Sequence, residues 1–572
     1  MGTPSRLAVV LLLAAAFRIA NLSAIARHPL AEYQATWAQG DMAVNVRWAD
    51  VIRGGDVLCR ETVHPFYPFH ESIAPRETWE RWWGGARVFQ QAPLYAYLLA
   101  GVRALGGEGF WAMAICQFLL GLANVALVFL VALRVFDIGV ATIAAVGAAI
   151  YGPLVFHEAV WLRDTLAVTT SLLALWALGR APEGGSWRWL GAGLALAAAF
   201  LARETALLFA PLAALWAWRR LAGGRRGAAL ITLALGVGLG VLPLAARNLA
   251  VGAPLLSFST RGLEGFVHGH AADGSPNDLV LAQSAKEILP AADGSLLRAI
   301  WLTLATHGSL GHFLGWEVRK AMAILASHEP ADNVNWYYFV ERSRVLRLSP
   351  GFALVLALGL VGLLLERRRG PGERLLRWFL LATFLGLLYG TLAARYRLVA
   401  VAVLMVYAAA ALAGAVQRIR ARRWAPAAGI LLTTLALAFG STRLYADVRA
   451  ARSRRLTEPM LAAVTYQQRR QPELALLELR AGLARAWREP GARTLSDDTL
   501  QLAALLVRIA AKSGRAAEVQ ADVDGLVAEF ADDWQLHRLA ADYYRDVLPQ
   551  PQRAAEHLAA AERLRPKQER ER

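Results

Sequence analysis

Ionisable residues occupy the short turns between the apolar segments of this 572-residue chain, and they are the first candidates for chemistry. These turns carry Asp41, His157, Glu158, Arg163, Asp164, Arg203, Glu204, Arg247, Arg395 and Arg397. Charged groups at membrane depth are costly and are usually functional. A carboxylate can accept a proton, and guanidinium groups bind phosphate oxygens bidentately. Gathered on one side of a membrane, these residues would suit an anionic, lipid-attached substrate.

Each group also has a structural interpretation, which the sequence leaves open. Asp41 follows Gly40 and could cap a short helix. Glu158 and the Arg203–Glu204 pair could be buried ion pairs that hold helices in register, and Arg395 and Arg397 could extend to lipid headgroups. The outer histidines could bind a metal, although interfacial hydrogen bonding is the favoured interpretation: they are His64, His70, His157, His268 and His270.

The composition places these residues in a membrane protein. Hydrophobic residues make up 56% of the chain, charged residues only 18%, and the mean hydropathy is +0.37. A soluble protein has roughly 45–50% apolar and about 25% charged residues. Of the net charge of +17, only +2 falls in residues 444–572. The rest clusters in arginine-rich gaps between apolar runs, as in cytoplasmic loops, so we expect no nucleic-acid partner.

The apolar runs predict an all-α, polytopic bundle of about 11 spans, each long enough or nearly so to cross about 30 Å of hydrocarbon. We expect spans at 7–25, 110–133, 137–156, 159–179, 187–202, 204–218, 227–246, 350–365, 375–393, 397–416 and 424–442. With a cytoplasmic N-terminus, the arginine clusters lie inside, and the loops 26–109 and 248–349 lie outside together with the candidate site. The odd number of spans places the C-terminal tail outside as well.

The outer loops and the tail contain further predicted helices. One short helix starts at Gly40–Asp41 and a second follows Pro93, and both would lie flat on the bilayer. The tail, residues 456–572, repeats the letters RAAE 38 residues apart, at 515–518 and 553–556. Paired Ala-rich helices of this kind are typical of tetratricopeptide-type units, which bind partners or brace a neighbouring domain. The expected domains are therefore 1–445 and 456–572.

The order of several motifs resembles a known family of membrane glycosyltransferases. The motifs, which cover most of residues 1–445, are QGDMAVNVRWADVIRGGD, QQAPLYAYLLA, HEAVWLRDTLA, LARETALLFAPLAALW, ARNLAVGAPLLSFSTRGLEGF, HEPADNVNWYY and AARYRLVAVAVLMVYAAAAL. They resemble glycosyltransferases of the GT-C fold, in the group of protein O-mannosyltransferases and lipid A aminoarabinose transferases (family 39-like). Within it, the chain looks like bacterial members with a C-terminal tetratricopeptide-like domain.

The resemblance implies an activity and a set of roles. A sugar would pass from a polyprenyl-phosphate donor to a protein, lipid or glycan acceptor, with inversion, outside the bacterial inner membrane. Asp41 would be the general base and Glu158 a second acidic site residue. The donor phosphate would be bound by Arg247, Arg395, Arg397 and Arg203, and the substrate would be contacted by Gln91, Tyr95, His157 and Glu204. No cofactor is required, although a divalent cation is compatible with the sequence.

Three other interpretations remain. A transporter or flippase would share the apolar spans, although the candidate charges lie at span ends and no repeat relates the two halves. An oligosaccharide ligase or polymerase of similar fold is a rival within the enzymes. A scaffold whose working part is the helical tail, with a protein partner bound there, is the third.

Overall fold

The structure is a computed structural model, and it describes residues 2–37, 40–60, 64–221, 223, 225–277, 279–365, 370–448, 455–486 and 496–566. Every regular element in this part of the chain is a helix, so the predicted all-α class is confirmed. The chain divides into two compact units, one of Met1–Ala26 with Gln34–Arg449 and one of Arg27–Tyr33 with Ala450–Arg572. The grouping of residues 27–33 with the tail was not indicated by the sequence.

All eleven predicted apolar segments are helical. They form α1 (Thr3–Ile25), α7 (Phe110–Val135), α8 (Ile138–Ile150) with α9 (Gly152–His157), α10 (Asp164–Arg180), α11 (Ser186–Ala202), η2 (Glu204–Phe209) with α12 (Ala210–Arg220), α13 (Arg225–Val251), α20 (Phe352–Leu365), α21 (Pro371–Tyr389), α22 (Leu398–Arg420) and α23 (Trp424–Arg443). Within the described residues, six stretches are long and apolar enough to cross a membrane: Thr3–Ile25, Phe110–Val135, Arg225–Val251, Arg344–Leu365, Ala394–Arg420 and Trp424–Arg443. These stretches fit a multi-pass membrane protein, and the number of about eleven spans stays a prediction.

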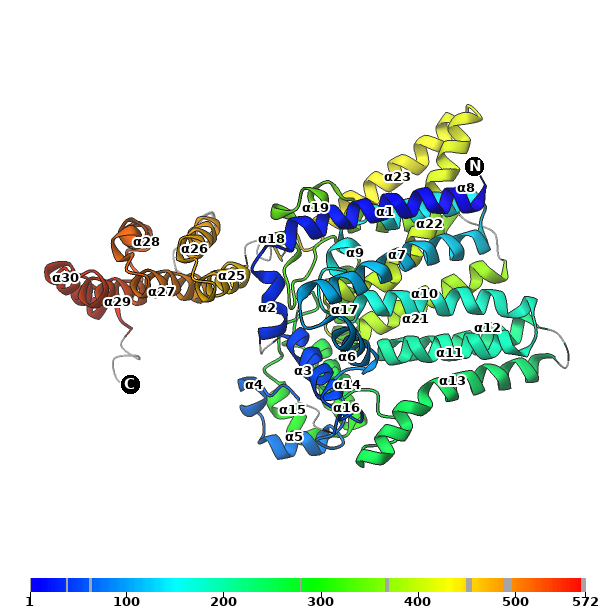
Figure 1. The fold of residues 1–572 in the computed structure, drawn as a ribbon, viewed down its shortest axis with the longest axis horizontal. Coiled ribbons are helices and arrows are strands. Elements are labelled where there is room, and N and C mark those ends of the chain that lie inside the picture. Colours follow the sequence, from blue (N-terminus) through cyan, green and yellow to red (C-terminus); the bar gives the residue numbers. More distant parts are fainter. Residues whose placement is uncertain are drawn as a thin grey trace. The chain divides into compact units, whose positions relative to one another are not determined.

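Small residues allow the helices of the larger unit to approach closely. Figure 1 shows α7, α10 and α11 running side by side, and α11 also packs against α13. Where α11 crosses α13, a Cβ atom on Gly193 would overlap the carbonyl oxygen of Leu233. A Cβ atom on Gly362 of α20 would likewise overlap the carbonyl oxygen of Tyr407 on α22. Such contacts are how helices gain packing energy in lipid, where no hydrophobic effect drives them together.

The two predicted short helices before the second span are present. They are α3 (Asp41–Arg53), which starts after Gly40, and α6 (Leu94–Gly106), which starts after Pro93. The two helices pack against each other, and the Nη2 atom of Arg103 lies 3.0 Å from Asp50 Oδ1 between them. This packing holds α3, whose first residue is Asp41.

The two long loops fold together into one cap beside the bundle. The first loop contributes α4 (Pro68–Glu71) and α5 (Arg76–Trp82), and the second contributes α14 (Arg261–His270), α15 (Ala285–Ala292) and α16 (Leu296–Ala305). Trp79 and Trp83 of the first loop share an apolar core with Val267 and Leu289 of the second. The second loop continues through α17 (Leu310–Leu325), α18 (Trp336–Arg342) and α19 (Arg344–Leu348).

The smaller unit is a set of short helices with its own core. It contains α25 (Thr457–Gln468), α26 (Pro472–Ala486), α27 (Asp497–Lys512), η4 (Ala516–Val519), α28 (Gln520–Glu529), α29 (Trp534–Asp542), η5 (Tyr543–Val547) and α30 (Pro551–Leu564). Leu479, Leu506 and Tyr543 are fully buried in its core. Each RAAE segment opens the second helix of a pair, before α28 and in α30. The tetratricopeptide assignment remains a prediction.

His64 makes the stability of the cap depend on pH. Its ring stacks on Trp83 with the centroids 4.5 Å apart, and burial lowers the pKa of His64 to about 4. An unfolded histidine has a pKa of about 6.5, so the unfolded chain binds a proton first as the pH falls, and this favours unfolding. We expect the thermal midpoint of the purified protein to fall between pH 7 and pH 4.5, and the substitution His64→Phe to remove part of that fall. The same pH dependence in both proteins would contradict this.

Candidate active site

Asp41 lies in a network of charged side chains drawn from distant parts of the chain. Its Oδ1 atom accepts a hydrogen bond from Arg261 at 2.8 Å, and its Oδ2 atom accepts one from Arg395 at 2.7 Å. The side chain of Asn333 donates to Oδ2 at 3.2 Å and accepts from the backbone N–H of Asp41 at 2.7 Å. Both carboxylate oxygens are therefore occupied.

The capping interpretation of Asp41 is not what the structure shows. Gly40 is the N-cap residue of α3, and Asp41 is the first residue inside the helix. The carboxylate of Asp41 bonds to Arg261, Arg395 and Asn333. Burial alone would raise the pKa of Asp41, but the nearby charges of Arg261 and Arg395 outweigh it. The pKa of this carboxyl group is therefore held well below its usual range, and Asp41 is ionised at neutral pH.

Arg395 joins Asp41 to two further carboxylates. Its Nε atom donates to Asp332 at 2.6 Å, and its Nη1 atom donates to Asp164 at 3.2 Å. Asp164 also accepts a hydrogen bond from Arg203 at 2.8 Å. Because Arg395 is only 4% exposed and is surrounded by carboxylates, it does not extend to lipid headgroups.

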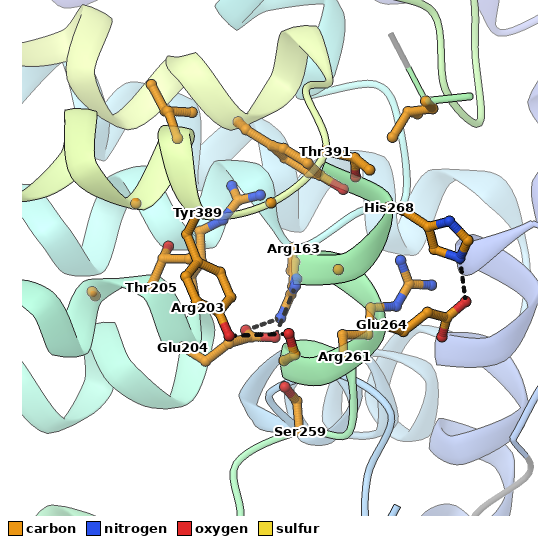
Figure 2. A pocket seen from close by; sticks show the side chains of 18 of the residues that line it. Arg163, Arg203, Glu204, Thr205, Ser259, Arg261, Glu264, His268, Tyr389 and Thr391 are labelled. Atoms are coloured by element: carbon orange, nitrogen blue, oxygen red, sulfur yellow. Dashed lines mark hydrogen bonds and ion pairs between the residues drawn. The ribbon is translucent and has the colours of Figure 1, made fainter. Parts of the chain in front are cut away.

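A cavity of about 390 Å³ lies beside this network (Figure 2). Its polar wall includes three guanidinium groups, those of Arg163, Arg203 and Arg261, and two carboxylates, those of Glu204 and Glu264. Arg163 and Glu204 form a two-point ion pair at 2.6 and 3.4 Å, and Arg203 stacks on the ring of Tyr396 at 4.5 Å. A guanidinium group has five N–H donors, so each arginine keeps donors for a ligand.

A second, largely apolar part of the cavity lining belongs to the bundle. Helices α10, α21 and α22, together with η2, supply it. It consists of Ser171, Phe209, Phe379, Ala382, Thr383, Gly386, Leu387 and Val399. The cavity thus joins a cationic end to a hydrocarbon-like surface, which are the two chemical requirements of a lipid phosphate.

Of the predicted phosphate-binding arginines, Arg203 lines the cavity and Arg395 lies in the adjoining network, whereas the other two do not reach it. Arg247 donates to the backbone carbonyls of Leu58, Cys59 and Arg87 at 2.6–2.8 Å. Arg397 donates to backbone carbonyls of the second loop and to Glu329 at 2.8 Å. Their hydrogen bonds hold the two long loops in place.

Glu158 is a structural ion pair in this structure. It lies 2.6 Å from Arg18 of α1, and both side chains are buried. It does not line the cavity, and this geometry corresponds to the alternative in which Glu158 holds helices in register. The signal for this pair was present in the sequence, because Arg18 interrupts an apolar span and a buried cation needs an anion.

Among the predicted substrate contacts, only Glu204 lines the cavity. Gln91, Tyr95 and His157 are buried nearby in the same unit, and none of them lies in the cavity wall. Within the described part of the chain, several of their polar atoms have no hydrogen-bond partner, including both amide atoms of Gln91 and the hydroxyl of Tyr95. Gln90, the neighbouring residue, does line the cavity.

The sequence did not predict Arg261, Glu264 or Asp332 as site residues, and it gave no role to Arg163. Arg261, Glu264 and His268 occur at a spacing of three and four residues, which places them on one face of α14. This stripe of polar residues in the second long loop was the sequence signal that could have identified Arg261 and Glu264 as site residues. Asp332 lies in the HEPADNVNWYY motif. Its position there did not indicate that it forms an ion pair with Arg395.

No metal site is apparent in the part of the chain that the structure describes. No group of three or more His, Cys, Asp or Glu residues there is arranged to hold a metal ion.

Comparison with protein families finds a match for one segment of the chain. Residues 90–246 match the family described as dolichyl-phosphate-mannose-protein mannosyltransferase. This segment contains Arg163, Arg203 and Glu204 of the cavity. The predicted resemblance to membrane glycosyltransferases is thereby confirmed for this segment. A search of curated protein sequences found no match.

Solved structures of membrane glycosyltransferases show only a distant likeness. For the oligosaccharyltransferase of Archaeoglobus fulgidus tethered with an acceptor peptide, the identity is 17%, the TM-score is 0.42, and the match covers 79% of this chain and 55% of that one. For ArnT from Cupriavidus metallidurans bound to undecaprenyl phosphate, the identity is 13% and the TM-score is 0.36. That match covers 92% of this chain and 76% of the ArnT chain. The chain thus spans about half the length of the oligosaccharyltransferase.

Proposed function

We propose that this protein transfers a sugar from a polyprenyl-phosphate donor to a hydroxyl group of a protein, lipid or glycan acceptor, on the extracytoplasmic side of the bacterial inner membrane. The observation that carries the proposal is one cavity that is lined both by Arg163, Arg203 and Arg261 and by apolar residues from helices of the bundle. The family match over residues 90–246 supports the reaction type.

The arginines would bind the donor phosphate and stabilise its departure. Guanidinium groups match phosphate oxygens in pairs, and they favour the charge that grows on the phosphate as the bond to the sugar breaks. The apolar wall would hold the first isoprene units of the donor. Positioning of both parts lowers the barrier, because the reacting groups no longer have to find each other.

Asp41 would become the general base when the donor binds. Without donor, its Oδ1 atom is bound by Arg261, whose side chain also lines the cavity. A bound phosphate competes for Arg261 and releases Oδ1. Asp41 then accepts the proton of the acceptor hydroxyl, the acceptor oxygen bonds to the anomeric carbon, and the electrons of the sugar–phosphate bond pass to the phosphate. Attack from the opposite face inverts the anomeric centre.

A transfer assay tests the proposal. Purified protein in liposomes would receive polyprenyl-phosphate hexoses with a labelled sugar and, as an acceptor source, cell-envelope extract from cells lacking this protein. We expect label to leave the lipid fraction and appear in protein, lipid or glycan at a rate that depends on Arg203. Label that remains on the lipid for every donor, or a rate unaffected by Arg203→Gln, would contradict the proposal.

The apolar wall gives a separate prediction for the lipid tail. Thr383 lies on α21 in this wall, and Thr383→Trp would fill the space predicted for an isoprene unit. Since each buried CH₂ contributes about 0.8 kcal/mol, loss of even part of one unit should raise the KM for a long-chain donor about tenfold. Leu381→Trp is the matched control, because Leu381 lies on the same helix and is 49% exposed. Equal KM values for both variants would contradict the assignment.

A further inference from the structure

Glu264 is a second carboxylate in the cavity, where it forms a hydrogen bond with His70 and lies close to His268. It lies on α14 and lines the cavity together with His70 and His268. The Nε2 atom of His70 lies 3.2 Å from Glu264 Oε1, and the Nε2 atom of His268 lies 3.7 Å from the same oxygen. Figure 2 shows Glu264 and His268 facing each other beside the cavity. One oxygen of the carboxylate is thus directed toward two imidazole rings.

Backbone hydrogen bonds fix the tautomer of both histidines. The N–H of Tyr67 donates to Nδ1 of His70 at 3.1 Å, and the N–H of Ala282 donates to Nδ1 of His268 at 3.0 Å. Because each Nδ1 is an acceptor, the proton of a neutral ring must lie on Nε2, which then points its N–H at Glu264. A protonated Nε2 cannot ligate a metal, so the pair serves the carboxylate instead.

The second oxygen of Glu264, Oε2, can accept hydrogen bonds from a ligand in the cavity. Among the described residues, the contacts of Glu264 all involve Oε1. Burial would raise the pKa of Glu264, but the hydrogen bond from His70 and the nearby charges outweigh it and lower that pKa. Glu264 is therefore ionised at neutral pH, and the oxygens of an ionised carboxylate accept hydrogen bonds from hydroxyl groups.

We propose that Glu264 is a sugar-binding residue whose Oε2 atom accepts hydrogen bonds from hydroxyl groups of the donor sugar while the donor phosphate is bound by Arg261. The inference rests on the proposed function. Arg261 and Glu264 are three residues apart on α14, so they are neighbours on one face, about 5–6 Å apart at Cβ. A sugar attached to a phosphate at Arg261 therefore reaches Glu264. The rings of Tyr67 and Phe69, also in the cavity wall, provide apolar surface for the sugar.

The charges around Glu264 favour a neutral sugar over a cationic amino sugar. An ammonium group at this position would gain one carboxylate but would also lie within one helical turn of the guanidinium group of Arg261, in a cavity that Arg163 and Arg203 also line. Like charges at short range oppose binding. We therefore assign the subsite to a neutral hexose.

Binding measurements with and without the sugar test this assignment. The full-length protein in nanodiscs would be titrated with undecaprenyl phosphate and with the undecaprenyl phosphates of mannose, glucose, galactose and 4-amino-arabinose. We expect one neutral hexose to strengthen binding over the bare lipid, and Glu264→Gln to reduce that gain about tenfold, the size of a hydrogen bond to a charged group. Binding of the bare lipid phosphate should stay within twofold. Glu287→Gln, an exposed carboxylate on α15, is the control and should change neither affinity.

Each other outcome counts against the proposal in a different way. If the gain from the sugar survives Glu264→Gln, or no neutral hexose gives a gain, the subsite is wrong. If Glu264→Gln weakens the bare lipid equally, Glu264 supports the fold or the phosphate site, and the assignment is also wrong. Tightest binding of the amino sugar would overturn the choice of a neutral hexose. A wild-type protein that binds none of the five lipids would overturn the proposed function itself.

Discussion

Replacement of Asp41 by Asn should abolish sugar transfer and leave the protein folded. The substitution keeps the shape of the side chain and an acceptor oxygen for Arg395, but it removes the group that would take the proton. General-base catalysis contributes about 10²–10⁴-fold, and the rate constant should fall by that amount. The measurement is the initial rate of label transfer with saturating polyprenyl-phosphate donor, together with the thermal midpoint of the purified protein.

Asp50→Asn provides a matched control for this substitution. Asp50 lies on the same helix, α3, and among the described residues its ion-pair partners are Arg53 and Arg103 rather than Arg261 and Arg395, the partners of Asp41. Its loss should leave the rate within about twofold of wild type, because a partly exposed ion pair contributes little. Transfer at the wild-type rate by Asp41→Asn would remove the assigned base. Equal losses in both variants would show that any ion pair on α3 matters for activity.

Replacement of Arg395 by Met should have the largest effect on stability. Arg395 is the shared partner of Asp41, Asp164 and Asp332, and it is 4% exposed. Its removal leaves buried carboxylates with fewer cations, and breaking a buried ion pair in this way costs about 3–5 kcal/mol. Chemical unfolding in mixed micelles should show this loss, and transfer should be lost because the position of Asp41 is no longer held.

Arg53→Met serves as the comparison for Arg395. Arg53 is a partly exposed arginine on α3 whose ion-pair partners are exposed. We expect its loss to cost less than about 1 kcal/mol. If both arginine variants unfold at the same denaturant concentration as wild type, the network around Asp41 does not stabilise the protein as its geometry indicates.

The helical architecture was predictable because hydrophobic runs of sufficient length have few alternatives in a membrane. Each predicted run corresponds to a helix, and the starts of α3 and α6 follow Gly40 and Pro93 as expected. Local signals determine these features: apolar composition for the long helices, and a glycine or a proline before the short ones. The long loops lacked such signals, and their shared core of tryptophan and aliphatic residues depends on contacts between distant segments.

The sequence predicted the site only to the extent that turns at the same end of the helical bundle lie close together. Asp41, Arg203 and Arg395 meet in one network because turns on one side of a bundle lie close together. The choice between Arg247 and Arg261 as the arginine at the cavity was not predictable. Arg247 is occupied by backbone carbonyls whose positions depend on how the first loop folds, and no spacing in the sequence encodes that path.

A structure with undecaprenyl phosphate bound tests the central claim most directly. Electron cryomicroscopy of the full-length protein in nanodiscs, saturated with this lipid, would locate the phosphate and the first isoprene units. The account predicts the phosphate within hydrogen-bond distance of Arg203 and Arg261, the tail along α21, and Arg261 moved away from Asp41. A phosphate bound elsewhere, for example at Arg247 or Arg397, with the Asp41–Arg261 pair intact, would contradict it.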